Sequence, residues 1–301
     1  MFADWTSWPR QWTVLVDAIM CTLRQKRRKF CCLFPIFAIL TVWSVIKAVY
    51  PQIIHDMYVY FLFSSPMTKD DLHSLNLTLG SLLGELNRLN VTYFMIGGTL
   101  LGSYRHHGRI PWDDDVDLML NSSDKKRIYK ALTALEPDYQ LWLSHSFNSA
   151  YHWKFFPLRH GRSVPLKSYR WPFVDLLFFS ENDTHVWNPS RSYPNEIWPR
   201  SVIFPLRQRP FDHFQIPAPC SVLRALIVDY SDTSICVSSN YSHKYDLRMP
   251  WWSVAVKCSD LAGRHPMVYR RSATNGFLQV NVEFLVLGNR ILHTITLRNH
   301  V

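Results

Sequence analysis

The chain has 301 residues, 48% of them hydrophobic and 15% aromatic, which is enough to bury a sizeable core and excludes a disordered protein. Lysine and arginine outnumber aspartate and glutamate by 33 to 23, and the formal net charge of +10 favours anionic ligands such as phosphates. No basic run follows the N-terminal region, so we expect no nucleic-acid partner.

The N-terminal segment predicts a membrane anchor. Residues 30–46 carry no charged side chain, and the residues up to Tyr50 extend this run to the length of about 20 residues that a spanning helix needs. The basic run Arg24–Lys29 lies just before it, so the positive-inside rule places residues 1–29 in the cytosol. A cleaved signal peptide or a buried core helix fits less well, because the run starts far from the first residue and is apolar on every face. We therefore expect a single-pass type II membrane protein with residues 30–50 as its signal anchor.

Features beyond the anchor fit an oxidising compartment in which proteins are glycosylated. Glycosylation sequons lie at Asn76, Asn90, Asn182 and Asn240, and a further sequon at Asn121 is too close to the acidic cluster to be expected to carry a glycan. Three cysteines in this part of the chain allow one disulfide and one free thiol, and the pairing stays open among Cys220, Cys236 and Cys258. Their spacing is not that of a compact zinc motif.

The elements beyond the anchor predict a mixed α/β core. Residues 51–67 form a stem, and Thr68 begins an amphipathic helix in which leucines recur at helical spacing up to Leu89. Strands and helices then alternate: a strand at 91–96, a helix at 99–107, a strand at 116–120, a helix at 122–135, and strands at 139–143, 151–157 and 172–179. This alternation indicates an α/β (α+β) domain over 68–240, with a mixed sheet and flanking helices.

The hydrophobic pattern weakens towards the C-terminus, after Tyr241. A helix is expected at 221–230, and two strands at 276–286 and 290–297 form a hairpin around Gly288-Asn289. We treat residues 241–301 as a C-terminal extension that contains this hairpin.

Two stretches carry the chemistry. The strand at 91–96 ends in Gly97-Gly98, and glycines at the start of a helix let backbone N–H groups approach a phosphate closely. Asp115 and Asp117 alternate on a strand, so both carboxylates project from one face at roughly 6–7 Å spacing and suit Mg²⁺ or Mn²⁺. A further carboxylate, Asp175, lies in an apolar strand and needs a partner, which the same cation can supply.

This order of elements resembles the nucleotidyltransferase fold of the polymerase-β type, and two motifs carry a closer resemblance to the LicD family. The first motif is GGTLLGSYRHHGRIPWDDDVDL at 97–118, and the second is PFVDLLFF at 172–179. The likeness covers about residues 70–235. It implies the metal-dependent transfer of a phosphorylated alcohol, of the ribitol 5-phosphate or phosphocholine type, from a CDP-activated donor to a glycan acceptor.

The resemblance also implies roles for individual residues. Asp115, Asp117 and Asp175 become metal ligands, and Asp113 becomes either a further ligand or the base that deprotonates the acceptor hydroxyl. The donor phosphates are expected beside Gly97, Gly98, Thr99 and Arg105. Together with the anchor, the family places the catalytic domain in the lumen of the Golgi or ER, and dimerisation through the stem stays open.

The other residues of the first motif are expected to have structural roles. We expect Asp114 to be solvated or to cap a helix, Trp112 to pack, and His106 and His107 to be structural or solvent-facing. Lys154 pairs either with a phosphate or with a core carboxylate. For the whole chain the alternative is a non-catalytic glycan-binding or scaffold protein that retains the nucleotidyltransferase fold, and a cytosolic polymerase-like nucleotidyl adder is a third interpretation.

Overall fold

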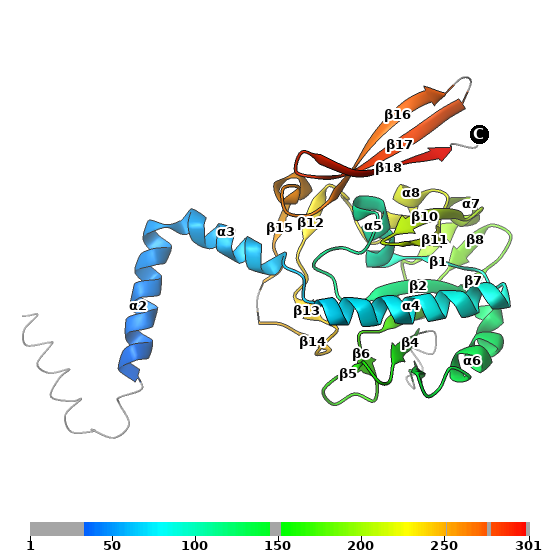
Figure 1. The fold of residues 1–301 in the computed structure, drawn as a ribbon, viewed down its shortest axis with the longest axis horizontal. Coiled ribbons are helices and arrows are strands. Elements are labelled where there is room, and N and C mark those ends of the chain that lie inside the picture. Colours follow the sequence, from blue (N-terminus) through cyan, green and yellow to red (C-terminus); the bar gives the residue numbers. More distant parts are fainter. Residues whose placement is uncertain (1–32, 145–151, 251, 276–277, 299–301) are drawn as a thin grey trace, which may run out of the picture. The chain divides into compact units, whose positions relative to one another are not determined.

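The structure, a computed structural model, describes residues 33–144, 152–250, 252–275 and 278–298 (Figure 1). The chain divides into two compact units, Met1–Phe61 and Leu62–Val301. The first unit contains α2 (Leu33–Val49) and most of α3 (Pro51–Leu62), so the expected stem is largely helical.

Helix α2 occupies most of the expected anchor and has 17 residues. Among the helices that the described residues form, none is both long and apolar enough to cross a membrane. The anchor predicted at 30–50 begins at residues that lie outside the described part of the chain.

A mixed sheet forms the centre of the second unit, as the sequence predicted. Its strand order is β1-β2-β7-β4-β3, in which β2 and β7 are parallel and the other neighbours are antiparallel. The strands are β1 (Tyr93–Met95), β2 (Val116–Asn121), β3 (Tyr139–Leu143), β4 (His152–Pro157) and β7 (Val174–Glu181), and β8 (His185–Trp187) and β9 (Ile197–Pro199) extend the sheet from β7. The parallel register pairs Asp117 with Asp175, which fixes the geometry of the site.

Helix α4 (Lys69–Leu89) runs across this sheet (Figure 1). Its start is the predicted capping box, in which the Thr68 hydroxyl accepts from the Asp71 N–H and the Asp71 carboxylate accepts from the Thr68 N–H. The leucines at helical spacing point into the core, and Leu75, Leu79, Leu82 and Leu86 are fully buried. The expected helix at 122–135 is a 3₁₀ turn followed by the shorter α6 (Lys125–Thr133), which packs beside α4.

Beyond β9 the elements are short. They are α7 (Arg200–Ile203), the hairpin β10 (Arg207–Phe211) and β11 (Phe214–Ala218), and α8 (Val222–Leu226), which covers only part of the helix expected at 221–230. Strand β12 (Ile235–Val237) pairs with β15 (Ala255–Lys257), and the disulfide joins Cys236 to Cys258 directly after β15, which leaves Cys220 free. Two further small hairpins are β5 (Arg162–Ser163) with β6 (Arg170–Trp171), and β13 (Tyr241–Ser242) with β14 (Leu247–Arg248).

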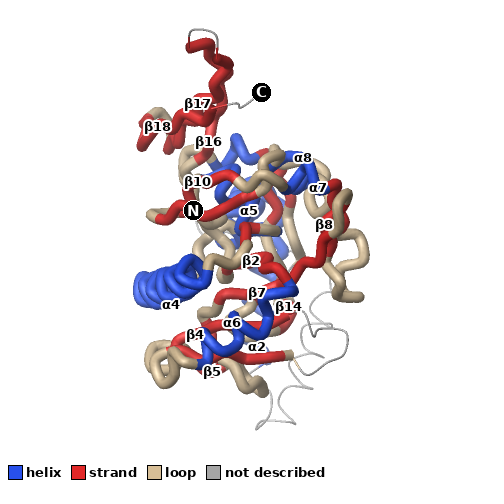
Figure 2. The backbone as a smooth tube through the Cα atoms, turned by 90° about the vertical axis from the view of Figure 1, so that its right-hand side faces the viewer, coloured by secondary structure: helices blue, strands red, loops and turns tan. Residues whose placement is uncertain are grey.

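The chain ends in a three-stranded antiparallel sheet of β16 (Met267–Asn275), β17 (Leu278–Leu287) and β18 (Arg290–Arg298), visible as a long ribbon in Figures 1 and 2. The predicted hairpin around Gly288 is confirmed, whereas β16 was not predicted. A buried ion network ties this sheet to the core. The Glu283 carboxylate accepts from His107, Arg209 and Arg270, each at 2.8 Å. Residues 241–301 are therefore part of the second compact unit.

Candidate metal and phosphate site

Three carboxylates meet where β2 and β7 lie side by side. Asp117 lies in β2, Asp175 is its partner in β7, and Asp115 directly precedes β2. One oxygen from each of the three lies within 4.8 Å of the others. The structure thus brings together the three residues expected to hold a metal ion, and β2 continues into Leu118, Met119 and Leu120, all fully buried, which fix the strand in place.

The charges of these carboxylates are only partly compensated. Burial, together with the charge of Asp175, raises the pKa of Asp117 to about 8, and burial raises the pKa of Asp115 well above its usual value. Burial also acts on Asp175, but the charges of Lys154 and His152 outweigh it and hold the pKa of that carboxyl well below its usual range. Lys154 Nζ lies 2.6 and 3.0 Å from the two Asp175 oxygens. The structure shows Lys154 paired with Asp175, one of the three clustered carboxylates, and Lys154 also lines the adjoining pocket.

The Gly97-Gly98 pair starts helix α5 (Gly97–His106) directly beside these carboxylates. Gly97 has a φ of +55°, and a Cβ added to Gly98 would lie 2.8 Å from Asp113 Oδ2. A side chain at either position would be strained or would collide, so glycine keeps the helix N-terminus close to the acidic groups. The Asp117 N–H donates to Thr99 Oγ1 at 2.7 Å, and this hydrogen bond joins the start of α5 to the strand that carries the clustered carboxylates. Gly97, Gly98 and Thr99 thus lie where a phosphate bound to the cation could reach backbone N–H groups.

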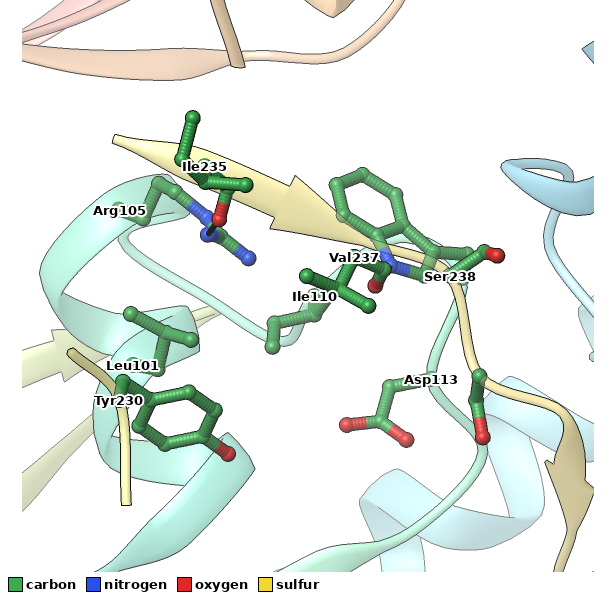
Figure 3. Close-up of a pocket in the computed structure, with 10 residues that line it drawn as sticks. Leu101, Arg105, Ile110, Asp113, Tyr230, Ile235, Val237 and Ser238 are labelled. Atoms are coloured by element: carbon green, nitrogen blue, oxygen red, sulfur yellow. Dashed lines mark hydrogen bonds between the residues drawn. The ribbon is translucent and has the colours of Figure 1, made fainter. Parts of the chain in front are cut away.

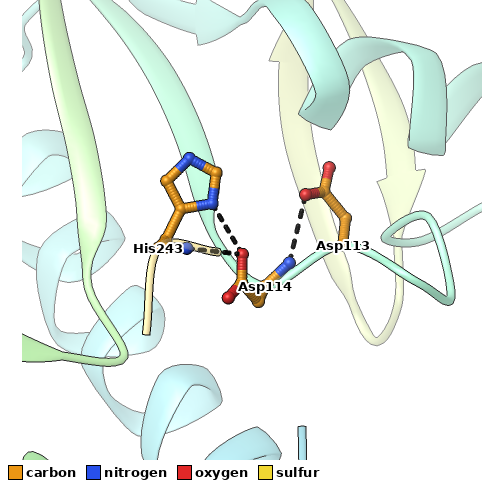
Figure 4. A group of neighbouring side chains, drawn as sticks. All are labelled: Asp113, Asp114 and His243. Carbon is orange, nitrogen blue, oxygen red and sulfur yellow. Dashed lines mark hydrogen bonds and ion pairs between the residues drawn. The ribbon is translucent and has the colours of Figure 1, made fainter. Parts of the chain in front are cut away.

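Asp114 differs from expectation. It is 4% exposed, because His243 lies against its carboxylate (Figure 4). The backbone N–H of Lys244 also donates to Asp114 Oδ2 at 3.2 Å. His243 Nδ1 lies 2.6 Å from Asp114 Oδ1, and its Nε2 lies 3.1 Å from Asp115 Oδ2. The neighbouring Asp113 is oriented by the Asp114 N–H, which donates to its Oδ1 at 3.1 Å. Burial raises the pKa of Asp113, although the charge of His243 opposes this.

His243 was missed by sequence reasoning. Burial alone would lower the pKa of its imidazole, but Asp115 and Asp114 outweigh burial and raise that pKa well above its usual value. A cationic His243 therefore supplies part of the positive charge that the acidic run needs. It lies 129 residues beyond Asp114 in the sequence, and no local pattern around it marks a site.

A pocket of about 570 Å³ opens beside the carboxylates. Asp113, Asp115, Asp117 and Asp175 line it together with Gly98, Lys154 and His243. Much of the remaining wall is aromatic and was not predicted: Trp142, Tyr169, Tyr193, Tyr230 and Tyr241. The hydroxyl of Tyr241 and the ammonium of Lys167 both contact Asp246, which joins the β13–β14 hairpin to the β5–β6 hairpin at this wall.

Arg105, the expected phosphate contact, does not line the acidic pocket itself. It is 7% exposed and lines a separate cavity that meets the acidic pocket only at Asp113 and Tyr230. The structural roles expected for His106 and Trp112 are confirmed. His106 is buried, with Nδ1 2.7 Å from Pro266 O, and Trp112 is buried and donates to Val237 O at 3.0 Å.

The sequons differ in accessibility. Asn90 and Asn182 are exposed, and Asn240 is half-buried. Asn76 lies inside α4, its amide oxygen accepts from Arg109, and Thr78 of the same sequon is fully buried. Glycosylation at all four positions stays a prediction, and at Asn76 it would require these contacts to break.

The fold and the site together define a class of protein. A mixed sheet that presents three clustered carboxylates beside a glycine-led helix N-terminus can hold a hard divalent cation and a phosphate group at one place. Residues 90–221 match the family described as LicD/FKTN/FKRP, nucleotidyltransferase domain.

Three curated proteins are similar to parts of this chain. The chain is 30% identical over 160 residues to the human ribitol 5-phosphate transferase FKRP, which is 52% of this chain and 30% of that protein. It is 45% identical over 40 residues to the lipopolysaccharide cholinephosphotransferase LicD of Haemophilus influenzae, 13% of this chain and 15% of that protein. The human ribitol-5-phosphate transferase FKTN is 28% identical over 153 residues, 49% of this chain and 30% of that protein. The matches cover under a third of each of these relatives.

Proposed function

We propose that this protein transfers a phosphorylated alcohol, of the ribitol 5-phosphate or phosphocholine type, from a CDP-activated donor to a glycan in a metal-dependent reaction. The observation that carries the proposal is the cluster of Asp115, Asp117 and Asp175 within 4.8 Å beside the glycine-led start of α5. The family supports it, since its named members include ribitol-phosphate and choline-phosphate transferases.

The residues present fit a divalent cation. Asp115, Asp117 and Asp175 offer hard oxygen ligands, and burial together with the neighbouring carboxylates raises the pKa values of Asp115 and Asp117, which a bound cation would offset. These three carboxylates would hold Mg²⁺ or Mn²⁺, which would offset the charge of the donor diphosphate and of the leaving phosphate.

The protein's own groups then perform the remaining work. The N-terminus of α5, with no Cβ at Gly97 or Gly98, receives the donor phosphates. Asp113 takes the proton of the acceptor hydroxyl, and burial raises its pKa toward the value that suits a general base. The acceptor oxygen forms a new bond to the phosphorus that carries the alcohol, the bond from that phosphorus to the CMP oxygen breaks, and CMP leaves.

The proposal includes a location. Residues 30–50 anchor the chain in the Golgi or ER membrane as a single-pass type II protein, with the catalytic unit in the lumen. Two observations support this: the Cys236–Cys258 disulfide, which suits an oxidising compartment, and the exposed sequons at Asn90 and Asn182.

The test compares the full chain with two variants in the presence of Mn²⁺, a panel of CDP-alcohols and glycan acceptors. Asp117→Asn keeps the shape of the side chain but removes a ligand charge, and we expect transfer to fall by about 100-fold or more. Asp138→Asn, at a side chain that is 65% exposed, is the matched control and should transfer at the wild-type rate. Release of CMP and mass spectrometry of the glycan measure the reaction.

Transfer that Asp117→Asn leaves unchanged would contradict the proposal. If wild-type protein binds glycans but neither binds nor cleaves any CDP-alcohol, the scaffold alternative takes its place.

A further inference from the structure

A second, smaller cavity adjoins the acidic pocket (Figure 3). Its volume is about 250 Å³, and its walls come from α5, from the turn at 110–113 and from β12. Asp113 and Tyr230 line both cavities, so the two cavities adjoin at these side chains. The cavity is smaller than pockets that enclose a whole ligand, and it suits a single ring.

The cavity contains the buried guanidinium of Arg105, and the carboxylate of Asp113 lines the same cavity. Arg105 Nε donates to His106 Nε2 at 3.1 Å, and its Nη1 donates to Ile235 O at 3.3 Å and to Cys258 Sγ at 3.5 Å. Within the described residues the guanidinium makes no salt bridge, and burial lowers its pKa to about 10, although Tyr230 and Asp113 oppose this effect. Burying a charge in this way is costly unless a ligand completes its hydrogen bonds. Figure 3 shows Arg105 at the wall of the cavity, where a ligand could complete its hydrogen bonds.

The other walls select the shape of the ligand. Leu101, Ile110, Ile235 and Val237 are apolar and would cover the faces of a flat ring, while Ser238 and Tyr230 add polar groups at its edge. A guanidinium fork pairs best with two adjacent acceptor atoms. Cytosine presents such a pair in O2 and N3, whereas uracil places an N–H at position 3 that would face the Arg105 donors. A quaternary ammonium would be repelled by Arg105.

We propose that this cavity is the nucleobase subsite and that Arg105 selects cytosine over uracil. The inference rests on the proposed CDP-activated donor and extends it to the residues that read the base. Strand β12 lies beyond residue 221, where the family match ends, and the Cys236–Cys258 disulfide holds it in place. The C-terminal part of this chain thus supplies one wall of the subsite.

The experiment measures the affinity of the full chain for CMP and for UMP in the presence of Mn²⁺ by calorimetry. Wild-type protein should bind CMP about tenfold or more tightly than UMP, because a site built for acceptor atoms leaves donors unpaired when UMP enters. Arg105→Met should weaken CMP binding by about tenfold and bring it to the level of UMP. Val237→Trp fills the cavity from an exposed wall residue and should weaken both nucleotides. Ile291→Trp, at a similarly exposed position of β18, is the matched control and should bind as wild type does.

The outcomes separate this inference from the proposed function. CMP binding that both Arg105→Met and Val237→Trp leave intact would overturn the subsite while the proposed function stands. Equal affinity of the wild type for CMP and UMP would overturn the selectivity. If the wild type binds neither nucleotide, the CDP-dependent function fails as well. Thermal melts show whether the Arg105→Met protein is folded. If it is not, the difference in CMP affinity between Val237→Trp and Ile291→Trp tests the subsite.

Discussion

At the scale of single residues, the acidic run is balanced by a histidine from a distant part of the chain. His243 contacts Asp114 at 2.6 Å and Asp115 at 3.1 Å, and Asp114 is almost completely buried. A buried carboxylate that loses its partner costs about 1–3 kcal/mol or more. His243 therefore stabilises the protein in the absence of a divalent cation.

This account predicts the behaviour of His243→Ala. Without metal, the variant should lose about 1–3 kcal/mol of unfolding free energy in urea, and added Mn²⁺ should recover part of the loss, because a cation at Asp115 replaces the missing charge. His160→Ala, at an exposed position of the same residue type, should change nothing. A His243→Ala protein as stable as the wild type without metal would contradict this role.

At the scale of elements, Glu283 joins the C-terminal sheet to the core. One carboxylate on β17 accepts from His107 at the end of α5, from Arg209 on β10 and from Arg270 on β16. Burial alone would raise the pKa of Glu283, but these three partners outweigh it and lower the pKa to about 2. Because the folded pKa lies below the unfolded value, this stabilisation is complete above about pH 4.5 and is lost as the pH falls toward 2.

Glu283→Gln tests this junction. The amide keeps the shape but leaves two guanidinium groups without a counter-charge, so the unfolding free energy at pH 7 should fall by about 3–5 kcal/mol. The control is Glu85→Gln, which removes a surface pair with Arg88 and should cost no more than about 1 kcal/mol. Equal losses in the two variants would show that the network contributes no more than a surface ion pair.

At the scale of the whole molecule, local patterns predicted what is local and missed what is distant. The capping box at Thr68, the leucine spacing of α4 and the alternation of Asp115 and Asp117 depend on neighbours a few residues away, and all three are present in the structure. The burial of Asp114 and the role of His243 depend on a contact between residues 129 positions apart. Arg105 follows the same rule, because its cavity exists only once the chain beyond residue 230 folds back onto α5. No periodicity encodes such contacts.

Whole-molecule stability should therefore depend on pH through buried carboxylates that act in opposite directions. Burial raises the pKa of Glu196 to about 7, although Asn188 donates to it at 2.7 Å. The folded state then holds a proton that the unfolded chain releases above about pH 4.5, so stability falls between pH 4.5 and 7, by about 3 kcal/mol at 1.36 kcal/mol for each pKa unit. In the metal-free protein Asp117, with a pKa of about 8, acts in the same direction, whereas Glu283 acts below pH 4.5.

Urea unfolding of the metal-free protein should accordingly show maximal stability near pH 4.5. Glu196→Gln cannot ionise and keeps an acceptor for Asn188, so it should flatten the alkaline side of this profile and leave the acid side unchanged. Glu283→Gln should flatten the acid side of the profile and leave the decline above pH 4.5 unchanged. Each variant is therefore the control for the other. A Glu196→Gln profile that still declines like the wild type between pH 4.5 and 7 would show that the Glu196 proton is not retained in the folded protein. Mn²⁺ should reduce only the part of the decline that Asp115 and Asp117 cause, because Glu196 does not line the acidic pocket.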